Sequence, residues 1–287
     1  MSLLFASSSS DLSLATIKKL GIECVCEPYQ KDSQICFFDE NFDFQKFYSK
    51  CKKGVDIDTA MLTCDDYIEI FEPCLKQGDD VVFVHSSENI CNCEELFKAR
   101  DILNEKYRDR KFILVDSKNI SIGQGLVTFA SALLYRKGED IDTLVEKTYE
   151  LRDEYAFYFA CDNLTKLEKN NLIDGTLLTG GTALNIKPIM TINLDGKIEL
   201  FDKVSGKKKA ISKLIDIIRQ TGENVADYPI GIVYTNDKNS AEELLSKIKE
   251  TFGNDTNVLF EQMTPNNTSI LGHEILGLSF HVHRKMH

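Results

Sequence analysis

The 287-residue sequence predicts an α/β protein of two domains, an N-terminal α/β domain over residues 1–156 and a C-terminal α+β domain over residues 157–287. In the first half, apolar strands end in Ser or Asp and are followed by helices, which is typical of a parallel sheet. In the second half, Asp195-Gly196 is a hairpin signal between two strands and indicates antiparallel pairing. Hydrophobic residues make up 43% of the chain, a fraction ordinary for soluble globular domains.

Strand and helix patterns alternate through the first half. Strands are expected at 3–6, 22–27, 81–84 and 111–115, and helices at 14–20, 41–51, 65–76, 94–107, 120–136 and 143–155. The apolar run 81–84 is typical of a strand covered on both faces. Thr63 and Asp66 have the spacing of a capping box, so Thr63 is expected to cap the helix 65–76. Thr59 lies before that cap, in a loop.

Hairpin and helix patterns mix in the second half. Strands are expected at 156–161, 183–193, 198–204, 230–235, 258–262 and 277–283, and helices at 164–168, 210–221 and 240–252. The Gly-rich stretch 179–182 is interpreted as a loop before a strand rather than a phosphate cradle.

Hydroxyl side chains follow the predicted strands of the first half. Ser86 and Ser87 come directly after the strand 81–84, Ser8 lies in the loop 7–10 after the first strand, and Ser117 follows the strand 111–115. Because ligands bind outside the carboxyl ends of parallel strands, these hydroxyls are candidates for holding a carboxylate or a phosphate. Alternatively, Ser86 and Ser87 cap the helix that begins near Cys93.

Charge and composition exclude several classes of function. The net charge of -11 argues against a nucleic-acid-binding or anionic-membrane-binding surface, because both need clustered Lys and Arg. No apolar run approaches the roughly 20 residues that span a bilayer, so a cytoplasmic protein without membrane insertion is expected. The nine cysteines are expected to be thiols, and neither they nor His281 and His283 form a convincing metal set.

Six segments in the right order resemble motifs of the DegV family of bacterial fatty-acid-binding proteins. The most specific is Leu184-Asn-Ile-Lys-Pro-Ile189 with Gly196-Lys197, which is similar to the family's "LNIKPI…G.I" block. The supporting segments are 6–12 ("TDSSADL"), 59–63 ("TSQPS"), 86–87 ("SSxLSGTY"), 115–126 ("VDS…G.G") and 276–280 ("LGLAF"). The resemblance runs nearly end to end.

The resemblance implies a three-layer N-terminal domain with a parallel sheet and a C-terminal α+β domain with a mixed sheet. It also implies a buried long-chain fatty acid as the ligand, no other cofactor, and a carboxylate held by Thr59 and by Ser86 or Ser87. Ser8 and His273 complete the candidate ligand-binding residues, which are thus Thr59, Ser86, Ser87, Ser8 and His273.

The resemblance further implies a separate fatty-acid kinase as a partner, and several motif positions differ in this chain. Ser205 stands where the family has the Arg of "KVRxxKKA", a difference that bears on kinase docking. Ile270 stands at the His of "HTGPG", with His273 three positions away, and the Arg of "GGR" falls on Leu172.

Two other functions remain possible from the residues. One is an acyl or phosphoryl transfer enzyme that uses Ser86 or Ser87 with His85 or His273. It is disfavoured because adjacent residues of a strand point to opposite faces, and because the chain has neither a phosphate loop nor a Gly-x-Ser-x-Gly elbow. The other is a divergent family member that senses another amphiphile. The favoured prediction is a carrier that is not itself an enzyme.

Overall fold

The computed structural model describes residues 2–174, 185–283 and 285. The N-terminal sheet contains four parallel strands in the order β2-β1-β6-β7. Their bounds are β1 (Ser2–Ser7), β2 (Glu23–Val25), β6 (Asp80–His85) and β7 (Phe112–Asp116). All of β6 except its first residue is buried, as expected of a strand covered on both faces.

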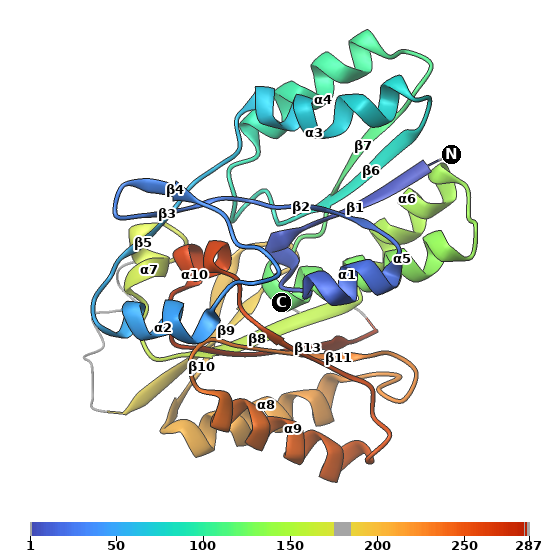
Figure 1. Cartoon of the computed structure of the whole chain (residues 1–287). Coiled ribbons are helices and arrows are strands. Elements are labelled where there is room, and N and C mark those ends of the chain that lie inside the picture. Colours follow the sequence, from blue (N-terminus) through green and yellow to red (C-terminus); the bar gives the residue numbers. More distant parts are fainter. Residues whose placement is uncertain (1, 175–184, 284, 286–287) are drawn as a thin grey trace.

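Helices cover both faces of this sheet (Figure 1). The helices α3 (Cys64–Lys76) and α4 (Glu94–Lys106) lie on one face. The other side carries α1 (Leu14–Leu20), α5 (Ser121–Arg136) and α6 (Ile141–Leu151). The predicted three-layer arrangement with a parallel sheet is confirmed.

The second sheet has six strands in the order β10-β9-β8-β13-β11-β12. They are β8 (Tyr155–Cys161), β9 (Ile186–Ile192), β10 (Ile198–Ser205), β11 (Ile230–Tyr234), β12 (Val258–Gln262) and β13 (Ile275–His281). Among the described strands of this sheet, β11 and β12 pair in parallel and the other pairs are antiparallel, so the sheet is mixed, as predicted. The helices α8 (Lys207–Thr221) and α9 (Lys238–Phe252) cover its outer face (Figure 1).

The helix α5 lies between the two sheets and contacts strands of both. Gly231 on β11 permits this approach, because a Cβ atom added there would lie 2.4 Å from Cγ1 of Ile122 on α5. The largest apolar cluster therefore includes side chains from both halves, such as Val82, Leu126 and Phe159. The division at residue 156 falls within β8 and stays a prediction.

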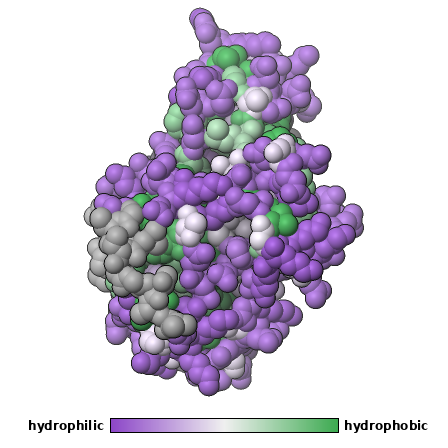
Figure 2. All heavy atoms as spheres, turned by 90° about the vertical axis from the view of Figure 1, so that its left-hand side faces the viewer, coloured by the Kyte–Doolittle hydropathy of each residue, from purple (hydrophilic) through white to green (hydrophobic). Residues whose placement is uncertain are grey.

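A third, antiparallel sheet lies beside the other two and was not predicted. It contains β4 (Gln34–Cys36), β3 (Tyr29–Lys31) and β5 (Ile57–Thr59) in that order, with α2 (Phe44–Lys52) between β4 and β5 in sequence. We call residues 29–59 the strap. The short helices α7 (Thr165–Lys169) and α10 (Pro265–Leu271) lie against it, and the 3-10 turn η1 (Ser8–Ser10) follows β1. The face that bears the strap is mainly hydrophilic (Figure 2).

Local sequence signals are confirmed where the structure describes them. The Thr63 side chain accepts a hydrogen bond from the Asp66 backbone N–H, and the Asp66 side chain accepts one from the Thr63 backbone N–H, so the capping box is present. Asp195 and Gly196 connect β9 and β10. The Gly-rich stretch 179–182 lies outside the described residues. Among the described residues, no helix has the length and apolarity needed to cross a bilayer.

Candidate ligand-binding site

The carboxyl ends of β1, β6 and β7 lie at one edge of the parallel sheet, as the pattern of hydroxyl residues predicts. At this edge Ser86 and Ser87 are buried and make internal hydrogen bonds. The Ser86 hydroxyl donates to Oε1 of Gln124 on α5 (2.7 Å), and the Ser87 hydroxyl donates to the carbonyl of Gly196 (2.8 Å). The two serines therefore link the parallel sheet to α5 and to the hairpin of the second sheet.

Neither serine caps α4. The residue that precedes this helix is Cys93, and no side chain of the described residues caps its N-terminus. The Ser87 hydroxyl instead accepts a hydrogen bond from the Asn89 backbone N–H (3.2 Å) and so fixes the turn after β6.

A cavity of about 280 Å³ opens beside Thr59 at the end of β5. This volume lies just below the roughly 300–1,000 Å³ of typical small-molecule sites. Its apolar lining comes from Ala60, Met61, Leu62, Tyr67, Ile90, Cys91 and Ile270, and its polar lining from Glu27, Thr59, Asn92, Asn170 and Asn266. Of the five predicted site residues, Thr59 is the one that lines this cavity within the described chain. The cavity thus combines apolar lining residues with a smaller set of polar ones.

Glu27 is a feature of the cavity that sequence reasoning missed. One of its carboxyl oxygens, Oε2, accepts hydrogen bonds from the Ser9 hydroxyl and from the Asn266 amide (2.9 Å). Its backbone N–H donates to the hydroxyl of Ser8 (2.9 Å). Ser8 is itself 1% exposed, so this predicted residue positions the Glu27 backbone. Burial raises the pKa of Glu27, although the hydrogen bonds from Ser9 and Ser7 act to lower it.

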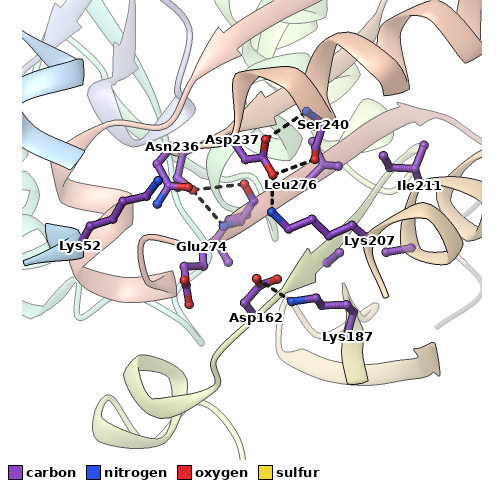
Figure 3. A pocket seen from close by; sticks show the side chains of 14 residues that line it. Lys52, Asp162, Lys187, Lys207, Ile211, Asn236, Asp237, Ser240, Glu274 and Leu276 are labelled. Atoms are coloured by element: carbon purple, nitrogen blue, oxygen red, sulfur yellow. Dashed lines mark hydrogen bonds and ion pairs between the residues drawn. The ribbon is translucent and has the colours of Figure 1, made fainter. Parts of the chain in front are cut away.

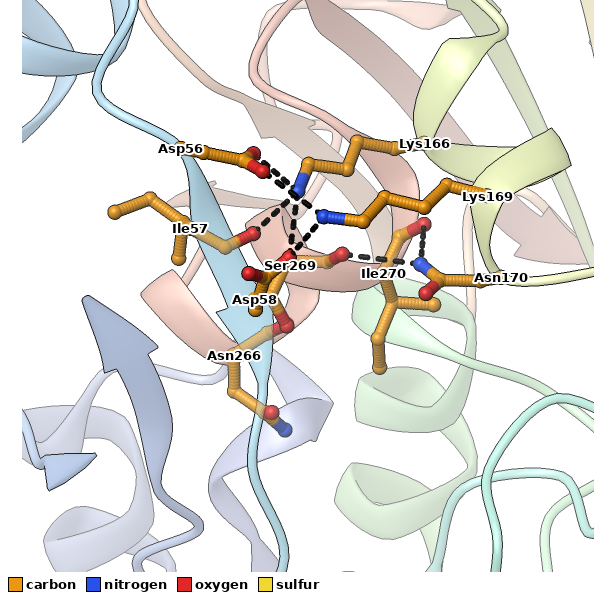
Figure 4. A network of polar contacts seen from close by, with 9 residues as sticks. All are labelled: Asp56, Ile57, Asp58, Lys166, Lys169, Asn170, Asn266, Ser269 and Ile270. Carbon is orange, nitrogen blue, oxygen red and sulfur yellow. Dashed lines mark hydrogen bonds and ion pairs between the residues drawn. The ribbon is translucent and has the colours of Figure 1, made fainter. Parts of the chain in front are cut away.

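His273 lies at another cavity, of about 220 Å³, which Lys166 and Asp56 also line. Beside it, the ammonium group of Lys166 contacts the carboxylate of Asp56 (2.5 Å) and donates to the carbonyl of Ile57 (2.6 Å), which joins α7 to β5 (Figure 4). Asn170 donates to the carbonyls of Ser269 and Ile270 at 3.1 Å each. The two predicted residues His273 and Thr59 thus line different cavities.

A third cavity, of about 140 Å³, lies where β11 ends and α8 begins. Three lysines line it, but two are held by carboxylates: Lys187 by Asp162 (2.6 Å) and Lys207 by Asp237 (2.5 Å) (Figure 3). Because these charges are paired, the cavity is a weaker candidate for an anionic ligand than its lysine content suggests.

The arrangement gives no support to serine chemistry. In the part of the chain that the structure describes, the hydroxyls of Ser86 and Ser87 donate to Gln124 and Gly196 and not to a histidine. Nδ1 of His85 contacts the backbone carbonyl of Ser86 (2.8 Å) and not its hydroxyl. The described residues also contain no group of three or more His, Cys, Asp or Glu side chains placed to hold a metal ion.

Comparison with known proteins decides the family. The family model described as "Uncharacterised protein, DegV family" matches residues 4–282. The chain belongs to the DegV family. A DegV domain-containing protein of Clostridium perfringens is 27% identical over 253 residues, 87% of each chain, and one of Caldanaerobacter subterraneus is 29% identical over 245 residues, 84% of each chain.

Solved structures of DegV proteins share the fold at lower identity. A DegV family protein of Thermus thermophilus, described as fatty acid binding, superimposes with a TM-score of 0.83 at 20% identity, over 98% of this chain and 99% of the other. DegV of Bacillus subtilis, described as a fatty acid binding protein, superimposes with a TM-score of 0.83 at 17% identity, over 98% of each chain. The Streptococcus pneumoniae Fatty Acid Kinase (Fak) B3 protein, loaded with linoleic acid, superimposes with a TM-score of 0.82 at 19% identity, over 98% of this chain and 100% of the other.

Proposed function

We propose that this DegV family member is a carrier that binds a fatty acid in the cavity beside Thr59. The observation that carries the proposal is the cavity's composition: most of its lining residues are apolar, and Thr59 is among the few polar ones. The likeness in fold to proteins described as fatty acid binding supports it.

Apolar burial supplies most of the affinity in this proposal. Each buried methylene is worth roughly 0.8 kcal/mol, whereas a hydrogen bond to the head group contributes about 0.5–3 kcal/mol. Thr59 therefore orients the head group more than it holds the ligand. Met61, which is 56% exposed, has the flexible side chain that adapts to tails of different shape.

The carrier is proposed to present its ligand to a separate fatty-acid kinase. The likeness in fold to the Fak B3 protein supports this proposal, and Ser205, exposed at the end of β10, marks where this chain departs from the family motif. All nine cysteines are free thiols, which suits a reducing cytoplasm. The kinase step is tested by adding the host's fatty-acid kinase and ATP to the loaded protein and measuring acyl phosphate.

The binding proposal is tested with Thr59→Val. We expect native mass spectrometry of the purified wild-type protein to show a bound fatty acid. Loss of one partly solvated hydrogen bond should raise the Kd for linoleate about two- to tenfold. Thr165→Val, an exposed threonine on α7 outside this cavity, is the matched control and should leave Kd unchanged. Absence of linoleate binding by the wild-type protein contradicts the proposal.

A further inference from the structure

The described lining of the cavity beside Thr59 contains a carboxyl group and no basic side chain. Glu27 follows β2 and lines the cavity together with Thr59. None of the described lining residues is Lys, Arg or His. Nor does any described basic side chain form an ion pair with Glu27; the polar contacts of its side chain come from neutral groups. A ligand carboxylate bound here therefore faces another carboxyl group.

Neutral side chains hold Glu27 in place at the cavity. Its Oε2 is fixed by Ser9 of η1 and Asn266 of α10, elements more than 250 residues apart in sequence. The same carboxyl group also has Ser7 as a hydrogen-bonding partner, and Glu27 lines the cavity. The side chain thus offers a positioned carboxyl group to whatever occupies the cavity.

Two carboxyl groups in one partly buried site share a proton, because two like charges at contact distance without a cation cannot both persist. We propose that the cavity takes its fatty acid as an acid pair, in which one proton is shared between the carboxyl groups of the ligand and of Glu27, and Thr59 donates to the same head group. This inference rests on the proposed function and specifies the ligand's protonation state. Where both groups are ionised before binding, the proton comes from solvent.

Other titratable groups near Glu27 do not supply this proton. Burial raises the pKa of Tyr67 on α3 and of Cys91 after β6, both of which line the cavity, and raises that of nearby Cys93 to about 12. These three groups therefore stay neutral from pH 6 to 9. Asp58 precedes Thr59, and the hydrogen bond from Lys169 lowers its pKa, so it stays ionised.

Cys26, the neighbour of Glu27, titrates within the range of the experiment. A hydrogen bond with Cys24 lowers the pKa of Cys26 to about 7 and raises that of Cys24. Cys26→Ser therefore serves as one control. Glu23→Gln, an exposed glutamate on β2, is the matched control for Glu27→Gln.

The probe is dodecanoate labelled with ¹³C at the carboxyl carbon. Its Kd and proton uptake are measured by calorimetry from pH 6 to 9 in two buffers of different ionisation enthalpy, and the bound carboxyl resonance is titrated by NMR. In the wild-type protein we expect Kd to rise toward about tenfold per pH unit above the pKa of Glu27 in the free protein, with uptake approaching one proton per ligand. The bound carboxyl should titrate together with Glu27 as a coupled pair.

In Glu27→Gln the pH dependence of Kd and the coupled titration should vanish, and binding at pH 9 should be tighter than in the wild-type protein. Both controls should behave like the wild-type protein. The acid pair is overturned if wild-type and Glu27→Gln proteins bind dodecanoate with the same pH profile and the same carboxyl resonance. If neither binds dodecanoate or linoleate at any pH, the proposed function itself fails.

Discussion

A single buried carboxyl group, Asp11, joins three segments of the chain. It accepts hydrogen bonds from the Ser121 hydroxyl (2.5 Å) at the start of α5 and from the Thr264 backbone N–H (2.7 Å) before α10. Asp11 is 1% exposed. Burial raises its pKa to about 7, although these hydrogen bonds act to lower it. A polar group so placed makes the stability of the protein depend on pH.

The sign of this dependence follows from proton binding. Because the pKa of Asp11 is higher in the folded protein than the roughly 3.9 of an unfolded Asp, the folded state binds more protons between pH 4 and 7. The free energy of unfolding therefore falls as pH rises through that window, by roughly 1.4 kcal/mol per unit from this group. Asp11→Asn keeps an acceptor for Thr264 and tolerates the left-handed φ of 53°.

We expect Asp11→Asn to lose less thermal stability than the wild-type protein between pH 5 and pH 8. Thermal unfolding followed by circular dichroism at both pH values measures the difference. Asp101→Asn, whose side chain is 69% exposed, is the control and should keep the wild-type dependence. Equal losses in Asp11→Asn and the wild-type protein contradict the assignment.

At the scale of elements, the strap depends on contacts with α7 and α10. Its three strands have three residues each, too short to be stable alone, and Lys166 bridges β5 to α7 with a side chain 16% exposed. Both Lys166 and Lys169 contact Asp56 and Asp58. The Lys169 side chain is 48% exposed, so water screens its ion pairs. Lys166 is thus expected to be the main side-chain tether of β5.

Lys166→Met should loosen the strap locally without unfolding the protein. We expect hydrogen exchange of β3 and β5 to accelerate about tenfold, since the lost contacts are worth on the order of 1–2 kcal/mol. Exchange in β6 should not change. Lys169→Met should have a smaller effect, and an equal or larger one would show that burial does not decide which lysine matters. The readout is hydrogen exchange by mass spectrometry.

Elements with local signals could be predicted, and those that depend on distant contacts could not. The capping box at Thr63 and the hairpin at Asp195-Gly196 are confirmed because their signals lie within four residues. The helix α10 escaped prediction because Pro, Asn, Thr and Ser are poor helix formers. In the structure Asn266 bonds Ser9 and Glu27, and Asn267 bonds the carbonyl of Ser9 (2.8 Å), contacts that sequence alone does not reveal.

In the candidate site, too, sequence position could be predicted but distant contacts could not. Thr59 lines the cavity, and its role in ligand binding stays a prediction, whereas Ser86 and Ser87, predicted from their position at a strand end, make contacts within the protein. Strand position places a hydroxyl at the sheet edge but does not decide its partner. That choice depends on Gln124 and Gly196, which come from other elements.

At the scale of the whole molecule, α5 couples the two halves. Its apolar side chains belong to the same core as strands of both sheets, and Ser87 and Asn89 donate to the carbonyls of Gly196 and Asp195 across the interface. Domains that share a core are expected to unfold together rather than in sequence.

Calorimetry should therefore show one thermal transition, with equal calorimetric and van't Hoff enthalpies. Leu126→Ala, at a fully buried position of α5, should lower the stability of that single transition by about 2–5 kcal/mol. Leu133→Ala, on the same helix but 41% exposed, should cost much less. Two separate transitions, of which Leu126→Ala shifts one alone, would show that the halves unfold independently and that α5 belongs energetically to one of them.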